Sequence, residues 1–195
     1  MYYLSVRSFV NLHVRTDNAS AISALAEELR TPGLALYVVP AGGWYSLYDE
    51  RLEADEDRQA LVAALLRASQ PGRAAAFMVL EDEALFWALA EAGRLVYSCT
   101  SDPDGEERRG SLPPDLDPAA VAAAEAGEPK TASVRALAQM LGLEPDHAVV
   151  GFGDLLEMDE ESELPEEVWI FEDPGAQAPQ IFTDRPYLEE EHAGG

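Results

Sequence analysis

The sequence predicts an α+β fold, in which one antiparallel sheet is built from two helix–strand–strand repeats with the helices on one face. Three observations lead to this fold class. Apolar residues make up 47% of the 195 residues, which is enough for a core despite a net charge of −24. Apolar positions recur with period two in some segments and with period 3.6 in others. Acidic residues gather after residue 100, which indicates a helical acidic C-terminal extension.

The sheet begins with a strand near residue 10. Val10, Leu12 and Val14 alternate with the polar residues Asn11 and His13. This alternation is typical of a strand that buries one face and presents polar side chains on the other.

A first helix–strand–strand unit follows this strand. Asp17 or Asn18 can cap a helix over 20–29, whose apolar positions recur at helical spacing. Thr31-Pro32-Gly33 ends the helix, because proline cannot continue it and glycine favours its C-terminal turn. The predicted strands of this unit are 34–39 and 44–48.

The same order recurs in a second unit. Asp55 is predicted to cap a helix over 56–68, and Pro71-Gly72 ends it. The glycines that stop the two helices, Gly33 and Gly72, lie 39 positions apart, which favours an internal duplication. The predicted strands of this unit are 74–80, 85–89 and 95–99.

The domain organisation follows from these elements. Apolar islands within the acidic tail, at 168–171 and 181–182, are predicted to dock on the sheet as an extra strand that covers an edge. The alternative is a peptide that adds to a partner's sheet. The predicted regions are a sheet domain over 1–100, a loop over 101–118, a helical extension over 119–158 and an acidic tail over 159–195.

The charge distribution limits the kinds of partner. Residues 101–195 hold 24 of the 37 Asp and Glu residues but only 5 of the 13 Lys and Arg residues. Such a surface repels nucleic acids and anionic membranes, so both are excluded as partners. We therefore expect a non-enzymatic acidic binding or regulatory protein for a basic protein partner.

Two aromatic residues, Trp169 and Phe171, are the candidate anchors for this partner, provided that they are exposed. A homodimer through an uncovered sheet edge is a further alternative. The carboxylates predicted to face the partner are those of Glu160, Glu161, Glu166 and Glu167.

The second candidate function is a small hydrolase or metal-dependent enzyme. Asp102, Asp104 and Glu106 cluster around a glycine, and carboxylate oxygens of this kind can hold Ca²⁺ or Mg²⁺. Their spacing does not fit an EF-hand. Cys99 is a candidate nucleophile only if a base lies nearby, and a buried inert thiol is the commoner case. Since no established catalytic or cofactor-binding motif occurs, we predict no cofactor and favour binding over catalysis.

A cytoplasmic location is expected from three features of the sequence. No stretch approaches the roughly 18 apolar residues that span a bilayer. The N-terminal residues lack the basic and apolar regions of a signal peptide. The single cysteine excludes an internal disulfide framework.

One resemblance concerns residues 1 to about 105. The string 43–50, the strand 85–89 after Glu81-Asp82-Glu83, and Tyr97-Ser98 followed by 102–104 resemble a family of acidic bacterial proteins with no established activity. Members of that family carry Asp-Ser-Asp where this chain has Glu81-Asp82-Glu83. The resemblance implies a bacterial source, and it carries over no functional residues.

Overall fold

The computed structural model describes residues 7–31, 33–160, 164–165, 167–171 and 180–181. The strands in this part of the chain are β1 (Phe9–Arg15), β2 (Leu36–Ala41), β3 (Trp44–Asp49), β4 (Arg73–Leu80), β5 (Ala84–Glu91), β6 (Arg94–Asp102), β7 (Gly105–Gly110), β8 (Trp169–Phe171) and β9 (Gln180–Ile181). The helices are α1 (Ala19–Leu29), α2 (Glu50–Asp55), α3 (Arg58–Ala68), α4 (Pro118–Glu125), α5 (Lys130–Leu141), α6 (Pro145–Ala148) and α7 (Phe152–Glu160).

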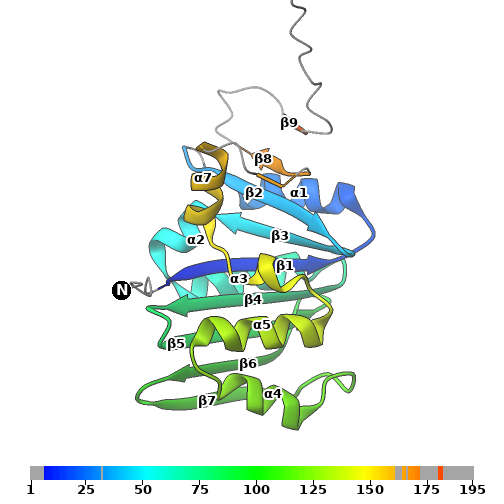
Figure 1. Cartoon of the computed structure of the whole chain (residues 1–195). Coiled ribbons are helices and arrows are strands. Elements are labelled where there is room, and N and C mark those ends of the chain that lie inside the picture. The colour runs from blue at the N-terminus through cyan, green and yellow to red at the C-terminus, as the bar shows by residue number, and fades with distance from the viewer. Residues whose placement is uncertain (1–6, 32, 161–163, 166, 172–179, 182–195) are drawn as a thin grey trace, which may run out of the picture.

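All the described strands join one antiparallel sheet in the order β7-β6-β5-β4-β1-β3-β2-β8-β9 (Figure 1). The predicted α+β class is confirmed. The N-terminal strand β1 lies in the middle of the sheet, between β3 and β4, and six of its seven residues are buried. Because both faces of this strand are covered, its polar side chains are buried as well.

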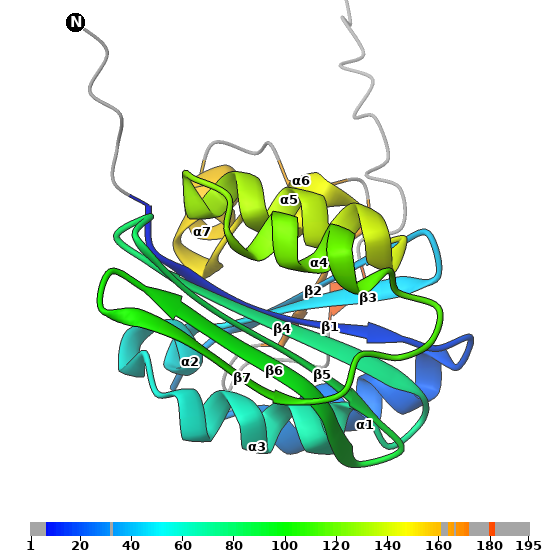
Figure 2. The ribbon, with the colours of Figure 1, turned by 90° about the horizontal axis from the view of Figure 1, so that it is seen from below.

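One face of the sheet packs against α1 and α3, and we call it the α3 face (Figure 2). Ile22 and Leu25 of α1 and Leu61 and Leu65 of α3 join Leu12 of β1 in one buried apolar cluster. Both helices therefore lie on the same face, as the sequence predicts. The duplication itself stays a prediction.

The opposite face packs against α4, α5 and α7, and we call it the α5 face (Figure 2). Val134 and Leu137 of α5 pack against Phe77 and Trp87 of the sheet. Farther along, Phe152 belongs to a smaller cluster with β2 and β3. The helical segment after residue 117 is therefore the second covering layer of the core.

The two ends of the sheet differ. At one end, β8 pairs with β2 so that Trp169 lies opposite Val38 and Phe171 lies opposite Leu36. Trp169 is 8% exposed and Phe171 is 2% exposed. At the other end, β7 pairs with β6 alone among the described strands.

Three local predictions are wrong. The predicted loop over 101–118 contains β7, which forms a hairpin with β6. The helix predicted over 56–68 begins at Arg58, capped by Asp57, and the separate helix α2 precedes it, capped by Asp49.

A third difference concerns the end of the predicted helical extension over 119–158, which forms two separate helices, α6 and α7. The Asn11 side-chain amide donates to the carbonyl oxygens of Ala148 and Val150, both at 2.9 Å. The backbone between the two helices thus bonds to the sheet instead of continuing a helix.

Helix α5 begins at a cap that comes from another part of the chain. One carboxylate oxygen of Asp82, in the turn between β4 and β5, accepts hydrogen bonds from the backbone N–H and the hydroxyl of Thr131, both at 2.7 Å. Asp82 has a φ of 56°, a left-handed conformation that glycine and asparagine also adopt. The turn therefore fixes the start of the helix that covers the α5 face.

We expect Asp82→Gly to lower the free energy of unfolding by about 1 kcal/mol, the typical value of a lost helix cap. Glycine tolerates the same φ, so the loss of unfolding free energy comes from the missing carboxylate and not from the backbone. Asp82→Asn keeps an acceptor oxygen, so its unfolding free energy should fall clearly less than that of Asp82→Gly. Urea unfolding of both variants measures the difference, and equal stability of Asp82→Gly and the wild type would exclude a capping role.

Candidate functional site

The acidic loop predicted to hold a metal ion is a tight hairpin turn. One carboxylate oxygen of Asp102 accepts the backbone N–H groups of Asp104 and Gly105, at 3.0 and 3.1 Å. The carboxylate of Glu106 pairs instead with Arg108. Among the described residues, the carboxylates of Asp102, Asp104 and Glu106 do not gather at ligand distance. The turn explains this acidic sequence without a metal ion.

A different cluster forms around Glu125, whose side chain is 0% exposed on the α5 face. One of its carboxylate oxygens accepts hydrogen bonds from Trp87 Nε1 at 2.8 Å and from the Tyr97 hydroxyl at 2.9 Å. Arg108 Nε donates to the other oxygen at 2.7 Å. The buried charge is thus compensated by an arginine and two neutral donors, as a buried carboxylate requires.

Potential ligand atoms of Cys99, Glu106 and Glu125 lie within 4.8 Å of one another. Arg108 pairs with both of these carboxylates, so its guanidinium supplies the positive charge that a metal ion would bring. Burial, followed by the charge of Glu125, raises the pKa of the Cys99 thiol to about 12. The thiol is therefore protonated at neutral pH and is a poor nucleophile.

A second buried polar cluster lies at the centre of the sheet. His13 Nδ1 is 2.8 Å from the Ser46 hydroxyl, and His13 Nε2 is 2.9 Å from Asn11 Oδ1. Because the Asn11 amide nitrogen donates to two backbone carbonyls, its oxygen must accept from His13 Nε2–H. Nε2 therefore carries a proton, and in the neutral imidazole Nδ1 accepts a hydrogen bond from the Ser46 hydroxyl.

This order of hydroxyl, imidazole and amide is similar to that of a catalytic triad, but its environment excludes that role. Ser46 and Asn11 are each 1% exposed and His13 is 0% exposed. Burial, together with a smaller effect of His147, lowers the pKa of His13 to about 3. Such an imidazole is too weak a base to accept a proton from serine at neutral pH.

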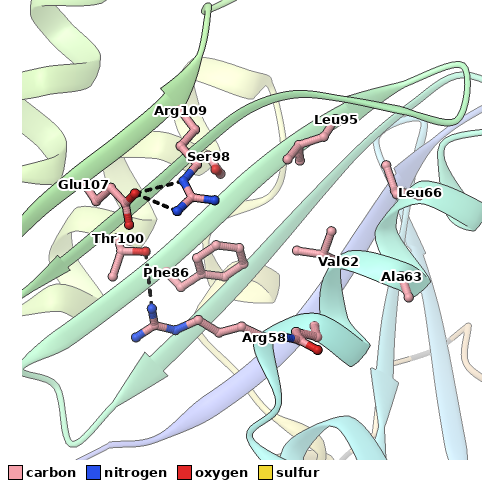
Figure 3. Close-up of a pocket in the computed structure, with 11 residues that line it drawn as sticks. Arg58, Val62, Ala63, Leu66, Phe86, Leu95, Ser98, Thr100, Glu107 and Arg109 are labelled. Atoms are coloured by element: carbon pink, nitrogen blue, oxygen red, sulfur yellow. Dashed lines mark hydrogen bonds and ion pairs between the residues drawn. The ribbon is translucent and has the colours of Figure 1, made fainter.

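An open groove lies at the margin of the α3 face, between α3 and the strands β5 and β6 that this helix does not fully cover (Figure 3). We call it the α3–β6 groove, and its volume of about 440 Å³ is in the range of small-ligand sites. Its apolar surface comes from α3, β5 and β6. The apolar lining residues are Val62, Ala63, Leu66, Phe86 and Leu95.

The polar side of the α3–β6 groove contains an arginine whose charge no described carboxylate neutralises. The guanidinium of Arg58 lies 5.9 Å from the centre of the Phe86 ring and donates to the Thr100 hydroxyl at 3.4 Å. In contrast, Arg109 forms a two-point ion pair with Glu107, at 2.7 and 2.9 Å. Arg58 therefore keeps donors for an anion beside an apolar wall.

The sequence-predicted partner-binding residues fall into three groups. Trp169 and Phe171 are buried, so they do not meet the condition of exposure on which their proposed role depends. Glu160 and Glu167 are described and exposed. Glu161 and Glu166 lie outside the described residues.

The groove was missed at the sequence level because its residues come from separate segments. Arg58 and Leu66 belong to α3, Phe86 belongs to β5, and Leu95 and Thr100 belong to β6. In the structure, Leu95 marks the groove as an apolar residue with 42% of its surface exposed. A sequence does not show exposure, so this residue could not indicate the groove beforehand.

The low pKa of His13 predicts an acid-sensitive core. The unfolded chain binds a proton at this imidazole below about pH 6.5, whereas the folded chain stays neutral there, so acid favours unfolding. Through this single site, the free energy of unfolding falls by up to about 1.4 kcal/mol for each pH unit below 6.5. His147, whose pKa burial also lowers, acts in the same direction. We expect the free energy of unfolding of His13→Gln to fall less than that of the wild type when the pH is lowered from 6.5 to about 5.

Urea unfolding across this pH range measures the effect. Asp49 and Glu53 act in the opposite direction as the pH falls, because burial raises the pKa of both carboxyls. Both are present in the wild type and in His13→Gln, so the comparison of the two proteins isolates His13. An independent readout in the wild type is the imidazole NMR signal of His13, which should not titrate in the same window. A midpoint near pH 6.5 would contradict the buried neutral imidazole.

Within the described residues, no helix is both long and apolar enough to cross a membrane. Neither a family model, nor a curated protein, nor a solved structure matches this chain.

Proposed function

We propose that this protein is a non-enzymatic binding protein whose α3–β6 groove takes an amphipathic ligand with an apolar chain and one carboxylate. The observation that carries the proposal is Arg58, an exposed arginine that no described carboxylate pairs with, at the polar side of an apolar groove. A cytoplasmic location is part of the proposal.

The apolar part of the ligand would lie along α3. Val62 and Leu66 form the wall of the groove, and Phe86 and Leu95 belong to the sheet beneath it (Figure 3). An apolar chain that covers these side chains removes their surface, and its own, from water, which is favourable by about 25 cal/mol per Å². An open groove of this kind suits a flexible chain that contacts protein along one side.

The carboxylate would lie at Arg58. The guanidinium of Arg58 has donors left after its bond to Thr100. Ser98 also lines the groove, and its side-chain hydroxyl makes no hydrogen bond with a described residue. A planar guanidinium binds carboxylates through two parallel hydrogen bonds. The overall charge of −24 opposes any anion, but exposed charges beyond about 8 Å are largely screened at physiological salt.

Calorimetric titration with dodecanoate tests this function, with dodecanol and dodecyltrimethylammonium as head-group controls. Arg58→Gln should weaken dodecanoate binding about tenfold, or about 1.4 kcal/mol, and leave dodecanol binding unchanged. Ala63→Trp, which fills the groove from an exposed position, should abolish both. The matched control is Arg67→Gln, which removes the same charge from a residue of α3 that does not line the groove and that pairs with Glu28.

Two results would contradict the proposal. One is equal affinity for the carboxylate and the cationic head group, which would remove Arg58 from recognition. The other is undiminished dodecanoate binding by Ala63→Trp, which would place the ligand elsewhere on the protein.

A second candidate function, binding of a basic protein, is favoured by the acids at the end of α7. Glu157 and Glu160 are exposed and make no ion pair with a described residue. Carboxylates at the C-terminal end of a helix oppose its dipole, so they do not stabilise α7. Their charge is therefore available to a cationic partner.

Titration with an arginine-rich peptide tests this second function. Glu157→Gln with Glu160→Gln should weaken binding several-fold at low salt, and the difference should shrink as salt screens the charges. Glu83→Gln with Asp104→Asn removes the same charge elsewhere on the surface and should have little effect. Equal weakening by both pairs would show a response to net charge alone.

A further inference from the structure

Strand β7 is an open edge of the sheet. Among the described strands only β6 pairs with it, and helix α4 lies over the α5 face at this end of the sheet (Figures 1 and 2). All six of its residues are exposed. An edge of this kind presents unpaired backbone N–H and C=O groups, to which another strand can bond.

The pairing with β6 shows which backbone groups point outward. Asp102 pairs with Gly105 across a two-residue turn, and such a closing pair is hydrogen-bonded. Hydrogen-bonded pairs alternate along an antiparallel ladder, and the bond from Ser111 N–H to the Val96 carbonyl continues this alternation. The backbone groups of Glu106, Arg108 and Gly110 therefore point to the open edge.

The side chains of β7 have an order that complements its own reversed copy. The strand reads Gly-Glu-Glu-Arg-Arg-Gly, with two acids followed by two bases. Glu107 and Arg109 lie on the α3 face, where both line the α3–β6 groove. Glu106 and Arg108 lie on the α5 face, near Glu125. Each face thus carries one acid and one base.

We propose that two copies of this protein associate through β7, antiparallel and about a two-fold axis that passes beside Arg108. Residues that lie opposite each other in an antiparallel pair point to the same face of the sheet. Glu107 of each copy therefore lies opposite Arg109 of the other copy, and the two-fold axis makes this contact occur twice. The two sheets become one continuous sheet across the axis.

The backbone pattern selects this register over the neighbouring one, which would centre on Glu107. Residues in non-hydrogen-bonded pairs approach more closely, about 4.5 Å between Cα atoms against about 5.5 Å. In the proposed register the opposite charges of Glu107 and Arg109 take the closer positions. The like charges at the axis are those of Arg108, which already pairs with Glu106 and Glu125 in its own copy. The alternative would bring two Glu107 side chains together at the shorter distance.

The charge order also explains why the partner is a second copy. Mixed charges on an edge strand discourage pairing with an arbitrary strand, because unmatched side chains would face each other. A reversed copy of the same strand is the partner whose charges match. The interface is self-complementary and leaves no β7 edge free, so it forms a closed dimer.

Sedimentation velocity over a range of protein concentrations at physiological salt tests the proposal. The wild type should show a reversible monomer–dimer equilibrium. Glu107→Arg and Arg109→Glu should each weaken dimerisation at least tenfold, because each places like charges at the two closest positions. The double variant, in which both charges are exchanged, restores opposite pairs and should return the dimer to near wild-type affinity.

The two single variants change net charge in opposite directions, so a general charge effect cannot weaken both. Glu157→Arg, which makes the same charge change on α7, is the control and should dimerise like the wild type. The proposal is overturned by a wild type that stays monomeric throughout. It is also overturned by single variants that dimerise normally, or by a double variant that does not recover.

Discussion

The structure depends on one constraint, which is that the central strands of the sheet are buried on both faces. Water cannot reach these strands, so every polar side chain on them must find its partners inside the protein. Asn11, His13 and Ser46 meet this requirement by bonding to one another and to the backbone between α6 and α7. The same requirement holds for Glu125 of α4, which is buried against the sheet and bonds to Trp87, Tyr97 and Arg108.

The same burial keeps two potentially reactive side chains in unreactive protonation states. His13 is held neutral, and the Cys99 thiol is held protonated. What remains available lies where the covering helices stop, on β6 and β7 beyond α3. There the sheet presents the α3–β6 groove on one face and an open strand edge at its side. The proposed binding function rests on this margin.

The sequence predicts the order of helices and strands well, because periodicity is a local property. Alternation at Val10, Leu12 and Val14 marks β1, and the spacing of Leu61 and Leu65 marks the buried side of α3. Strand β7 was missed because its four charged residues show no apolar alternation. It forms because the Asp102 turn and the pairing with β6 hold it in place.

The other errors arise where contacts between distant segments override local preference. The break between α6 and α7 is fixed by Asn11, more than 130 positions away in the sequence. The prediction that 168–171 docks on the sheet as an extra strand is confirmed, because β8 pairs with β2. The same pairing buries Trp169 and Phe171, so they lack the exposure that a role as partner anchors requires. The groove joins α3 to strands that follow it, and no local pattern records that meeting. Sequence reasoning thus predicted the sheet and the helices on one face, but neither the second covering layer nor the groove.

Methyl NMR spectra recorded with and without dodecanoate test the central claim most directly. If function lies at the uncovered margin, the largest shift changes will belong to Val62, Leu66 and Leu95, and Arg58→Gln will reduce them. Shift changes centred on Val134 and Leu137, under α5, would contradict the account, because they would show that a ligand enters the covered face.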